Sequence, residues 1–258
     1  MGKTTERFTG RVDHYRQYRP RYPALIVGLL QQECGLTEES SIADVAAGTG
    51  LLAEIFLAQE YSVIAVEPND GMRHVCSLLA EQFPKLQCVS GTAEATGLAA
   101  HSVDLITVGQ AMHWFDLKQT RAEFVRVLKP NGWCAVVYNH RKISGDGFHE
   151  KYEHLLREFG TDYATVCEQH LTAEKLRDFF APCEMRRASF SNAQRLTLEG
   201  LEGRVLSSSY MPSMEHPRYH AMRAAIADLF EKYEKGGEVC LEYECVVCYG
   251  LLGRSASV

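Results

Sequence analysis

The sequence predicts an α/β fold in which helices cover both faces of a doubly wound, mostly parallel sheet. Short apolar segments rich in β-branched residues alternate with segments whose apolar residues recur at helical spacing. Such alternation is typical of βαβ units, whose strands run parallel. The 258 residues and 46% hydrophobic content suffice for one large domain with a well-packed core. We therefore expect one domain whose ligand binds beyond the carboxyl ends of the strands.

The predicted strands and helices follow one another regularly along the first 140 residues. The apolar segments predicted as strands cover residues 41–45, 62–66, 86–89, 103–108 and 132–138. The segments with helical spacing cover residues 51–56, 72–79 and 117–128, and the last of these stops at Pro130. The residues up to Glu39 are also predicted to be helical, with breaks at Pro20 and Pro23.

The pattern loosens beyond residue 144. Residues 149–180 and 219–233 are predicted to be helical, and residues 184–190 to form a strand. Residues 240–250 alternate between the two faces of a strand, with apolar or aromatic side chains at every second position. This part of the chain therefore adds helices and further strands to the regular first half.

A glycine-containing turn follows the first predicted strand. It spans residues 44–50 (DVAAGTG), and Glu67 closes the next strand. Glycines at this position let the backbone approach a ligand closely. A carboxylate about 20 residues beyond such a turn accepts hydrogen bonds from ribose hydroxyls. The two features together predict a ligand that contains a ribose.

Asp44 helps to distinguish between ribose-containing ligands. A dinucleotide needs a turn aimed at its pyrophosphate without a negative charge nearby, and Asp44 would repel that group. The same carboxylate suits the methionine ammonium of S-adenosylmethionine. The first glycine of the dinucleotide motif G-x-G-x-x-G is also missing. The turn therefore favours S-adenosylmethionine, while a dinucleotide and a purely structural turn remain open alternatives at this point.

Five segments resemble, in order and spacing, the motifs of class I S-adenosylmethionine-dependent methyltransferases of the small-molecule Methyltransferase 11 type. They are residues 44–50, 63–68, 91–94, 104–115 and 124–132. The chain departs from the family pattern at Ala46 and Asn131, which stand where the family has glycine, although asparagine still permits a left-handed backbone. Residues 15–23 and 110–115 further resemble a subgroup that includes trans-aconitate methyltransferase-like proteins.

The resemblance implies a Rossmann-like, doubly wound sheet of seven strands whose last strand runs antiparallel, with a helical lid. Residues 1–258 would form one domain with four parts. An N-terminal helical cap would cover residues 1–39, and a cofactor-binding core residues 40–140. A lid that shapes the acceptor site would cover residues 144–235, and the final strand residues 239–250.

The resemblance also implies an enzyme whose cofactor is S-adenosylmethionine. Glu67 would hold the ribose, and Ala93 and Glu94 would flank the adenine. Met72 would pack either on the adenine or in the core. Arg19 would either pair with the methionine carboxylate or belong to a cap held by surface salt bridges. The expected cofactor-binding residues are Tyr18, Arg19, Asp44, Ala46, Gly48, Thr49, Gly50, Glu67, Pro68, Met72, Ala93, Glu94 and Gln110.

The acceptor is expected to lie near His113 and Trp114, because these residues follow the fourth strand, where the donated methyl should point. Trp114 could wall the acceptor pocket. His113 is the candidate catalytic residue, as a general base or a hydrogen-bond donor, and a purely structural role is the alternative. Methyl transfer is a displacement that alignment and desolvation can accelerate, so a base is required only if the acceptor must lose a proton. Tyr210 either contacts the acceptor or ends a helix.

Composition narrows the partners. The net charge of −6 argues against nucleic acid, whose backbone is bound by basic surfaces. No segment is long and apolar enough to span a membrane. No metal site is expected, because the sulfurs of Cys245 and Cys248 would point to opposite faces of the predicted strand. Nine scattered cysteines and a polar N-terminus indicate a cytoplasmic protein, expected to be a monomer or homodimer that acts on a small molecule. An RNA or protein methyltransferase and a non-catalytic S-adenosylmethionine-binding protein remain the alternatives.

Overall fold

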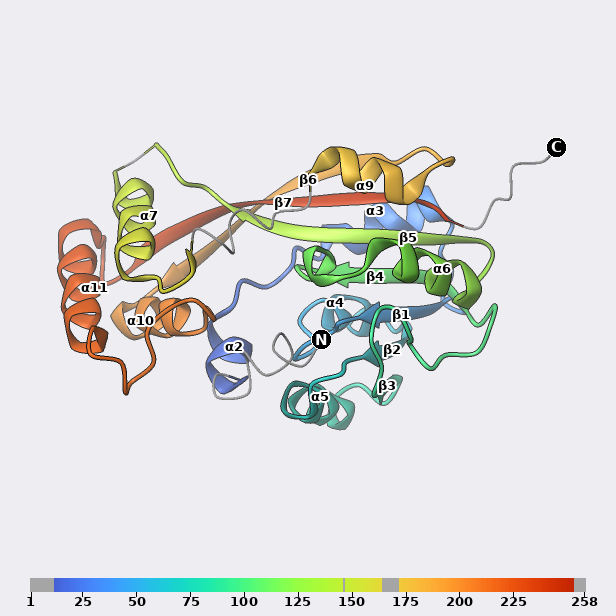
Figure 1. Cartoon of the computed structure of the whole chain (residues 1–258), viewed down its shortest axis with the longest axis horizontal. Helices are drawn as coiled ribbons and strands as arrows, with labels where there is room; N and C mark the ends of the chain where they lie inside the picture. Colours follow the sequence, from blue (N-terminus) through green and yellow to red (C-terminus); the bar gives the residue numbers. More distant parts are fainter. Residues whose placement is uncertain (1–11, 146, 164–171, 253–258) are drawn as a thin grey trace.

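A seven-stranded mixed sheet forms the centre of the molecule in the computed structural model, which describes residues 12–145, 147–163 and 172–252 (Figure 1). The strand order is β3-β2-β1-β4-β5-β7-β6. The strands are β1 (Ser41–Val45), β2 (Ser62–Val66), β3 (Leu86–Val89), β4 (Val103–Gly109), β5 (Leu128–Arg141), β6 (Arg186–Leu196) and β7 (Val239–Leu251). This architecture confirms the predicted Rossmann-like fold with an antiparallel last strand.

Helices connect the strands and lie on both faces of the sheet (Figure 1). The α-helices are α2 (Val12–Tyr18), α3 (Leu25–Cys34), α4 (Ala53–Leu57), α5 (Asp70–Ser77), α6 (Leu117–Val127), α7 (Phe148–Phe159), α9 (Ala173–Phe180), α10 (Leu198–Leu206) and α11 (Tyr219–Tyr233). Two 3₁₀ turns, η2 (Leu78–Glu81) and η3 (Met112–Trp114), follow α5 and β4. None of these described helices is both long and apolar enough to cross a membrane.

The sheet register places the predicted ligand site. Strand β1 pairs in parallel with β2 on one side and with β4 on the other, so that Asp44 lies opposite Ala65 and Thr107. The chain order therefore reverses direction across the sheet between β1 and β4. In open α/β sheets the ligand crevice forms at such a point, beyond the carboxyl ends of the strands.

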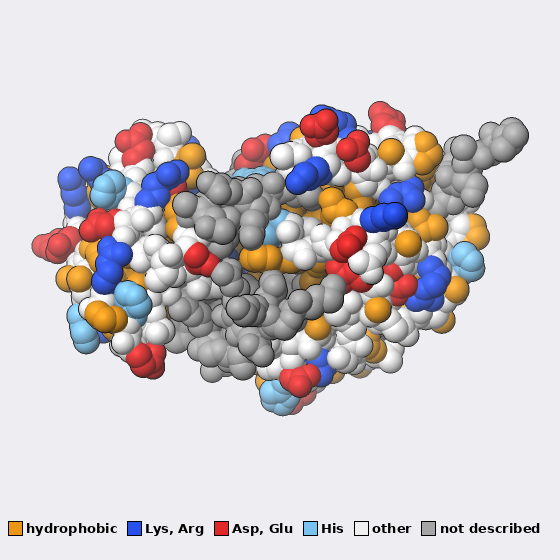
Figure 2. Space-filling model, in the orientation of Figure 1, with side chains coloured by type: hydrophobic (Ala, Val, Ile, Leu, Met, Phe, Trp, Pro, Cys, Tyr) orange, Lys and Arg blue, Asp and Glu red, His pale blue; other side chains and the backbone are white. Residues whose placement is uncertain are grey.

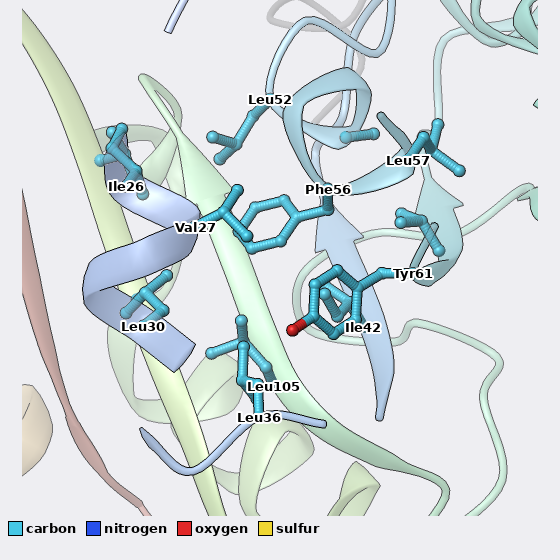
Figure 3. Close-up of a cluster of buried hydrophobic side chains, with 14 of the residues drawn as sticks. Ile26, Val27, Leu30, Leu36, Ile42, Leu52, Phe56, Leu57, Tyr61 and Leu105 are labelled. Carbon is cyan, nitrogen blue, oxygen red and sulfur yellow. The ribbon is translucent and has the colours of Figure 1, made fainter. Parts of the chain in front are cut away.

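Successive residues of the central strands point to opposite faces and supply two cores. Ile42 packs on one face with Leu30 of α3 and Phe56 of α4 (Figure 3). Its neighbour Ala43 belongs to the other face, where Phe124 of α6 is buried with side chains of α9. Burial on both faces explains why these strands read as continuous apolar runs.

The connection between α6 and β5 differs from its prediction. The sequence predicted a helix as far as residue 128 and a strand from Gly132. Instead α6 ends at Val127, and Leu128 already pairs with Val103. The register of the β4–β5 pairing then shifts between Val103 and Leu105, and Leu105 pairs with Trp133. Asn131 has φ +63°, the left-handed backbone that asparagine was expected to permit in this turn.

Strands β5, β6 and β7 continue past the core and carry a group of helices at the far end of the sheet (Figure 1). Tyr152 of α7, Leu201 of α10 and Ile226 of α11 share a third apolar cluster with Leu241 of β7. Helix α9 is different, because its Phe179 packs with α6 in the main core. The expected lid range thus contains an end lobe of α7, α10 and α11 and a segment that belongs to the sheet core.

Candidate active site

The turn after β1 is shaped by residues with a left-handed backbone. Ala46, Gly48 and Gly50 have φ of +56°, +57° and +82°. A Cβ on Gly48 would meet only Tyr15 Cε1, at 4.0 Å, so this glycine leaves space open beside the turn. A Cβ on Gly50 would lie 2.9 Å from Cys76 Sγ, so this glycine allows the turn to pack against α5 instead. Gly48 therefore keeps space open for a ligand, and Gly50 allows close packing inside the protein.

Glu67 ties the two loops that follow β1 and β2. Its side chain is buried, with Oε2 accepting a hydrogen bond from Gly48 N at 2.9 Å and Oε1 accepting one from Asn69 N at 2.9 Å. Burial raises the pKa of Glu67, and the two backbone hydrogen bonds oppose that rise. Each carboxylate oxygen can accept a further bond. Glu67 is thus a fixed acceptor at the rim of a cavity.

That cavity, which we call the cofactor cavity, lies over the carboxyl ends of β1, β2 and β4. It is lined mainly by apolar atoms beside the Glu67 carboxylate. Its described lining residues are Tyr15, Ala46, Gly48, Glu67, Pro68, Asn69, Met72, Thr92, Ala93, Glu94, Gly109, Gln110, Ala111, Trp114 and Phe115. Of the expected cofactor residues, eight lie in this lining: Ala46, Gly48, Glu67, Pro68, Met72, Ala93, Glu94 and Gln110.

Asp44 and Thr49 are buried next to the lining residues rather than among them. Asp44 Oδ1 accepts a hydrogen bond from Thr107 Oγ1 at 2.9 Å, and Oδ2 accepts one from Ala53 N at 3.1 Å. Burial raises the pKa of Asp44 to about 7, against these two bonds, and repulsion from Glu67 adds to the rise. Asp44 therefore anchors the turn and α4, and its interaction with a methionine ammonium stays a prediction.

Gln110 stands at the end of β4 with a left-handed backbone, φ +59°. Its N–H donates to Val137 O at 2.9 Å and its Nε2 to Asn139 O at 3.2 Å, so both backbone and side chain are held by β5. Strained backbone of this kind is held in place only by well-determined surroundings and is concentrated at functional sites. Together with Tyr15 and Trp114, Gln110 lines the cofactor cavity and also a second cavity.

The second cavity has a volume of about 430 Å³ and lies between the sheet and the end lobe. We call it the acceptor cavity. It is built from the α2 end, the β4–η3 turn, the β5 end, α7, α10 and β7. Its described lining residues are Tyr15, Arg19, Pro20, Tyr22, Leu51, Gln110, His113, Trp114, Tyr138, Asn139, His140, Arg141, Ile143, Glu153, Arg157, Tyr163, Arg204, Ser209, Tyr210 and Tyr243.

All three expected acceptor residues, His113, Trp114 and Tyr210, lie in this second lining. The His113 ring is tilted against Trp114, with centroids 4.6 Å apart, and its centroid is 6.3 Å from that of Tyr138. Tyr138 is partly buried, and burial raises its pKa. The Tyr210 ring packs edge-on against Tyr163 at 4.9 Å. The structure thus brings an imidazole, an indole and phenols to one cavity.

Tyr18 and Arg19 lie on the acceptor side of the molecule. Arg19 lines the acceptor cavity, and its Nη2 donates to Ser207 O at 3.0 Å. The Tyr18 ring packs on Gly203 of α10, where a Cβ would fall 2.2 Å from ring atom Cδ2, and its hydroxyl donates to Glu199. Neither residue is in the described lining of the cofactor cavity, so their predicted contacts with the cofactor stay predictions.

Sequence reasoning missed several residues that line the two cavities. Asn69 carried a signal that could have revealed it, because it caps α5 by accepting a hydrogen bond from Met72 N at 2.9 Å. Phe115 lies inside a motif that the resemblance had identified. Arg141 and Arg204 carried no local signal, since they reach the acceptor cavity from β5 and α10 through the tertiary fold.

Comparison with known proteins identifies the family. Residues 43–136 match the model of the methyltransferase domain. An uncharacterized methyltransferase of Schizosaccharomyces pombe is 32% identical over 226 residues, covering 86% of each chain. This chain belongs to the methyltransferase-domain family. The methyl donor of the family is S-adenosylmethionine, which is therefore the cofactor of this methyltransferase.

Two further similarities place the methyltransferase among known folds and relatives. A solved structure assigned as a type II methyltransferase from Anaeromyxobacter dehalogenans superposes with a TM-score of 0.70 at 23% identity, covering 92% of this chain and all of that one. The ubiquinone/menaquinone biosynthesis C-methyltransferase of Campylobacter jejuni is 28% identical over 121 residues, which cover 44% of this chain and 50% of that one. The first similarity concerns the fold alone.

The cofactor cavity of the methyltransferase has the chemistry that S-adenosylmethionine requires. A buried carboxylate, Glu67, lines it together with the apolar side chains of Met72 and Ala93, and these groups fit the hydroxyls of a ribose and the apolar faces of an adenine. The open space at Gly48 would be narrowed by any Cβ. Among the described residues, no group of three histidine, cysteine or acidic side chains could hold a metal ion. The residues present therefore fit the family's organic cofactor.

Proposed function

We propose that this methyltransferase acts on a small organic molecule bound in the acceptor cavity. The observation that carries the proposal is the junction of the two cavities, which share Tyr15, Gln110 and Trp114. A methyl group delivered at that junction would meet an acceptor enclosed by the sheet and the end lobe. Methyl transfer depends on holding donor and acceptor in line at short distance, and a shared wall provides that alignment.

On the cofactor side, each residue has a proposed role. When bound, S-adenosylmethionine supplies a methyl group on a sulfonium, which is a good leaving group. Glu67 accepts hydrogen bonds from the ribose hydroxyls. Met72 and Pro68 pack on the adenine, with Ala93 and Glu94 at its edge. The turn after β1 and Gln110 surround the methionine portion, and Asp44 balances its ammonium.

On the acceptor side, His113 is the candidate to hold or remove a proton at the acceptor atom. Its ring lies against Trp114, which forms part of the wall shared with the cofactor cavity. Tyr210 reaches the same cavity from the end of α10. The cap of residues 1–39 and the lid of residues 144–235 would exclude water from the junction, although residues 1–11, 146 and 164–171 lie outside the described parts.

The charge of the surface supports a small acceptor over RNA. The chain has a net charge of −6. Figure 2 shows acidic and basic side chains interspersed over one face, without a continuous basic area among the described residues there. Binding of a nucleic acid backbone depends on such an area. The quinone-biosynthesis relative also acts on a small molecule by its name.

The subgroup resemblance to trans-aconitate methyltransferase-like proteins belongs to the same proposal. Its two segments, residues 15–23 and 110–115, supply much of the acceptor cavity wall, including Pro20, Tyr22 and His113. A monomer or homodimer, as expected from the sequence, is part of the same proposal.

The proposal is tested with S-adenosylmethionine labelled on its methyl group. The enzyme is incubated with a cell extract separated by filtration into a small-molecule fraction and a macromolecular fraction. We expect label to enter a small molecule, and we expect Glu67→Ala to abolish most of it at low cofactor concentration. Transfer of label only to RNA or protein would overturn the small-molecule assignment.

A further inference from the structure

The acceptor cavity contains more positive than negative charge. Arg19, Arg141, Arg157 and Arg204 line it, and Glu153 is the single carboxylate among its described lining residues. Arg141 and Arg157 both form ion pairs with Glu153, which is therefore shared. Both ion pairs of Glu153 are thus with Arg141 and Arg157. No other carboxylate among the described lining residues is present to pair with Arg19 or Arg204.

Arg19 and Arg204 have no carboxylate partner among the described residues. Arg19 donates through Nη2 to Ser207 O at 3.0 Å, while its Nε is buried without a hydrogen-bond partner. Arg204 is 7% exposed and is held by neutral groups. Its Nη1 donates to Ser208 Oγ at 3.1 Å and its Nε to Tyr243 Oη at 3.3 Å.

Arg19 and Arg204 line the same cavity, and the charge of Arg204 acts unfavourably on the Arg19 cation. Burial lowers the pKa of Arg19, and the positive charge of Arg204 adds to this effect. Cations that are withdrawn from water and lie near another cation are costly unless an anion compensates them. The fold nevertheless fixes both. The Tyr15 ring lies under Arg19, 4.9 Å from Cζ, and Tyr243 Oη donates in turn to Gln194 Oε1 at 2.7 Å.

We propose that Arg19 and Arg204 bind an oxyanion group of the acceptor, a carboxylate or a phosphate, while its methylated atom lies toward His113 and Trp114. This inference rests on the proposed function, because it names the chemical class of the same acceptor. An oxyanion would accept charge-assisted hydrogen bonds from the guanidinium groups of Arg19 and Arg204, and its negative charge would compensate their positive charges. Arg141, whose Nη1 is buried without a hydrogen-bond partner, would provide a further donor to a larger anion.

The carboxylate of the cofactor is a second possible source of the same chemistry. Neither Arg19 nor Arg204 lies in the described lining of the cofactor cavity. Arg204 belongs to α10, on the side of the acceptor cavity formed by the end lobe. The position of both groups therefore favours the acceptor as the source, and the experiment separates the two.

The first arm measures binding of simple anions. Succinate and inorganic phosphate are titrated against the full chain, with thermal stability as the readout and neutral succinamide as the control ligand. We expect one or both anions to stabilise the wild type, and affinity to fall about tenfold or more in Arg19→Gln and Arg204→Gln. Arg204→Lys should retain part of the wild-type affinity for these anions. Arg223→Gln, a surface variant of the same lobe whose arginine pairs with Glu202, should bind like the wild type.

Arg19→Gln provides a second test if Arg204→Gln does not fold, because Arg19 lies at the end of α2 and is only half-buried. Anion binding that is equally strong in Arg19→Gln and in the wild type would overturn the proposal. So would the absence of any stabilisation by either anion.

The second arm identifies the source of the anion. S-adenosylhomocysteine is compared with methylthioadenosine, which lacks the amino-acid carboxylate. If the arginines serve the acceptor, Arg19→Gln should change the affinity for both compounds by the same small factor. A selective loss of S-adenosylhomocysteine affinity would assign Arg19 to the cofactor and overturn its role here.

The third arm separates this inference from the proposed function. The small-molecule fraction of a cell extract is split on an anion-exchange resin before incubation with methyl-labelled cofactor. We expect the methylated acceptor to come from the retained, anionic fraction. A product formed only from the unretained fraction would overturn the anion site and leave the proposed function intact, whereas label only in macromolecules would overturn the proposed function itself.

Discussion

The cofactor cavity and the acceptor cavity share a wall but are built in different ways. Apart from Tyr15, the cofactor cavity is lined by residues between 46 and 115, at the ends of neighbouring parallel strands. Its surface is mostly apolar, with one buried carboxylate held by backbone N–H groups. The acceptor cavity takes residues from 15 to 243 and is lined by arginine and tyrosine side chains.

This difference suits the different needs of a cofactor and an acceptor. A common cofactor needs a common set of contacts, and short strand-end turns supply them through backbone geometry. An acceptor needs selective contacts, and side chains carried by added helices supply them without disturbing the sheet. The division predicts that substitutions in one cavity leave the function of the other nearly intact.

The largest expected effect is on turnover, in the acceptor cavity. His113→Ala should reduce turnover while leaving cofactor affinity nearly unchanged, because His113 lines only the acceptor cavity. A loss of about 10²–10⁴-fold would indicate proton transfer, and a much smaller loss would indicate positioning. A base must be deprotonated to act, so the wild-type rate should fall on acidification and the variant should lose that dependence. Loss of cofactor binding or of folding would assign His113 a structural role.

The next effect is on cofactor affinity. Glu67→Ala should weaken S-adenosylhomocysteine binding by roughly 2–4 kcal/mol, because two hydrogen bonds to a charged group are lost. The measurement is a calorimetric titration. Glu33→Gln, an exposed carboxylate paired with Arg186, is the matched control and should bind as the wild type does. An unchanged dissociation constant in Glu67→Ala would remove Glu67 from the ribose site.

The third prediction compares two variants, one at each of the two glycines of the β1 turn. Gly50→Ala should lower the free energy of unfolding by about 2–3 kcal/mol, because left-handed backbone strain adds to contact with Cys76 and Leu79. Gly48→Ala should cost about 1–2 kcal/mol, since only the backbone term applies, but should weaken cofactor binding. Urea unfolding measures both. Equal destabilisation by the two variants would contradict the packing role of Gly50.

The smallest effect concerns a proton. Because the pKa of Asp44 is about 7 in the ligand-free fold, roughly half of these side chains carry a proton at neutral pH. A nearby ammonium lowers that pKa, so cofactor binding should release about half a proton and tighten from pH 6 to pH 8. Calorimetry in two buffers of different ionisation enthalpy counts the proton. The same release in Asp44→Asn would show that Asp44 does not face the ammonium.

The sequence signals that point to the cofactor cavity are local. The spacing from the DVAAGTG turn to Glu67 and the segment at Ala93 and Glu94 are short-range patterns, and the structure brings these residues to one cavity. The sequence could not show that Gly48 leaves space open beside the turn whereas Gly50 allows close packing. That depends on which neighbour approaches each Cα, and the neighbour of Gly50 is a helix.

The acceptor cavity could be predicted only in part. His113 and Trp114 follow a strand end, so their place in the fold could be inferred, whereas Arg204 lies within a helix whose position depends on the end lobe. Arg19 was expected at the cofactor because its guanidinium could pair with the methionine carboxylate. Its contact with Ser207 O, 188 residues away in the chain, could not be predicted from the sequence, and its contact with the cofactor stays a prediction.

The central claim is that the two cavities divide the work between cofactor and acceptor. The most direct test is a calorimetric titration of S-adenosylhomocysteine into Arg204→Gln, alongside wild type and Glu67→Ala. The account predicts a dissociation constant for Arg204→Gln within about twofold of wild type, which is near the error expected for sites without shared contacts. A loss of affinity comparable to that of Glu67→Ala would contradict it, because Arg204 would then belong to the cofactor site.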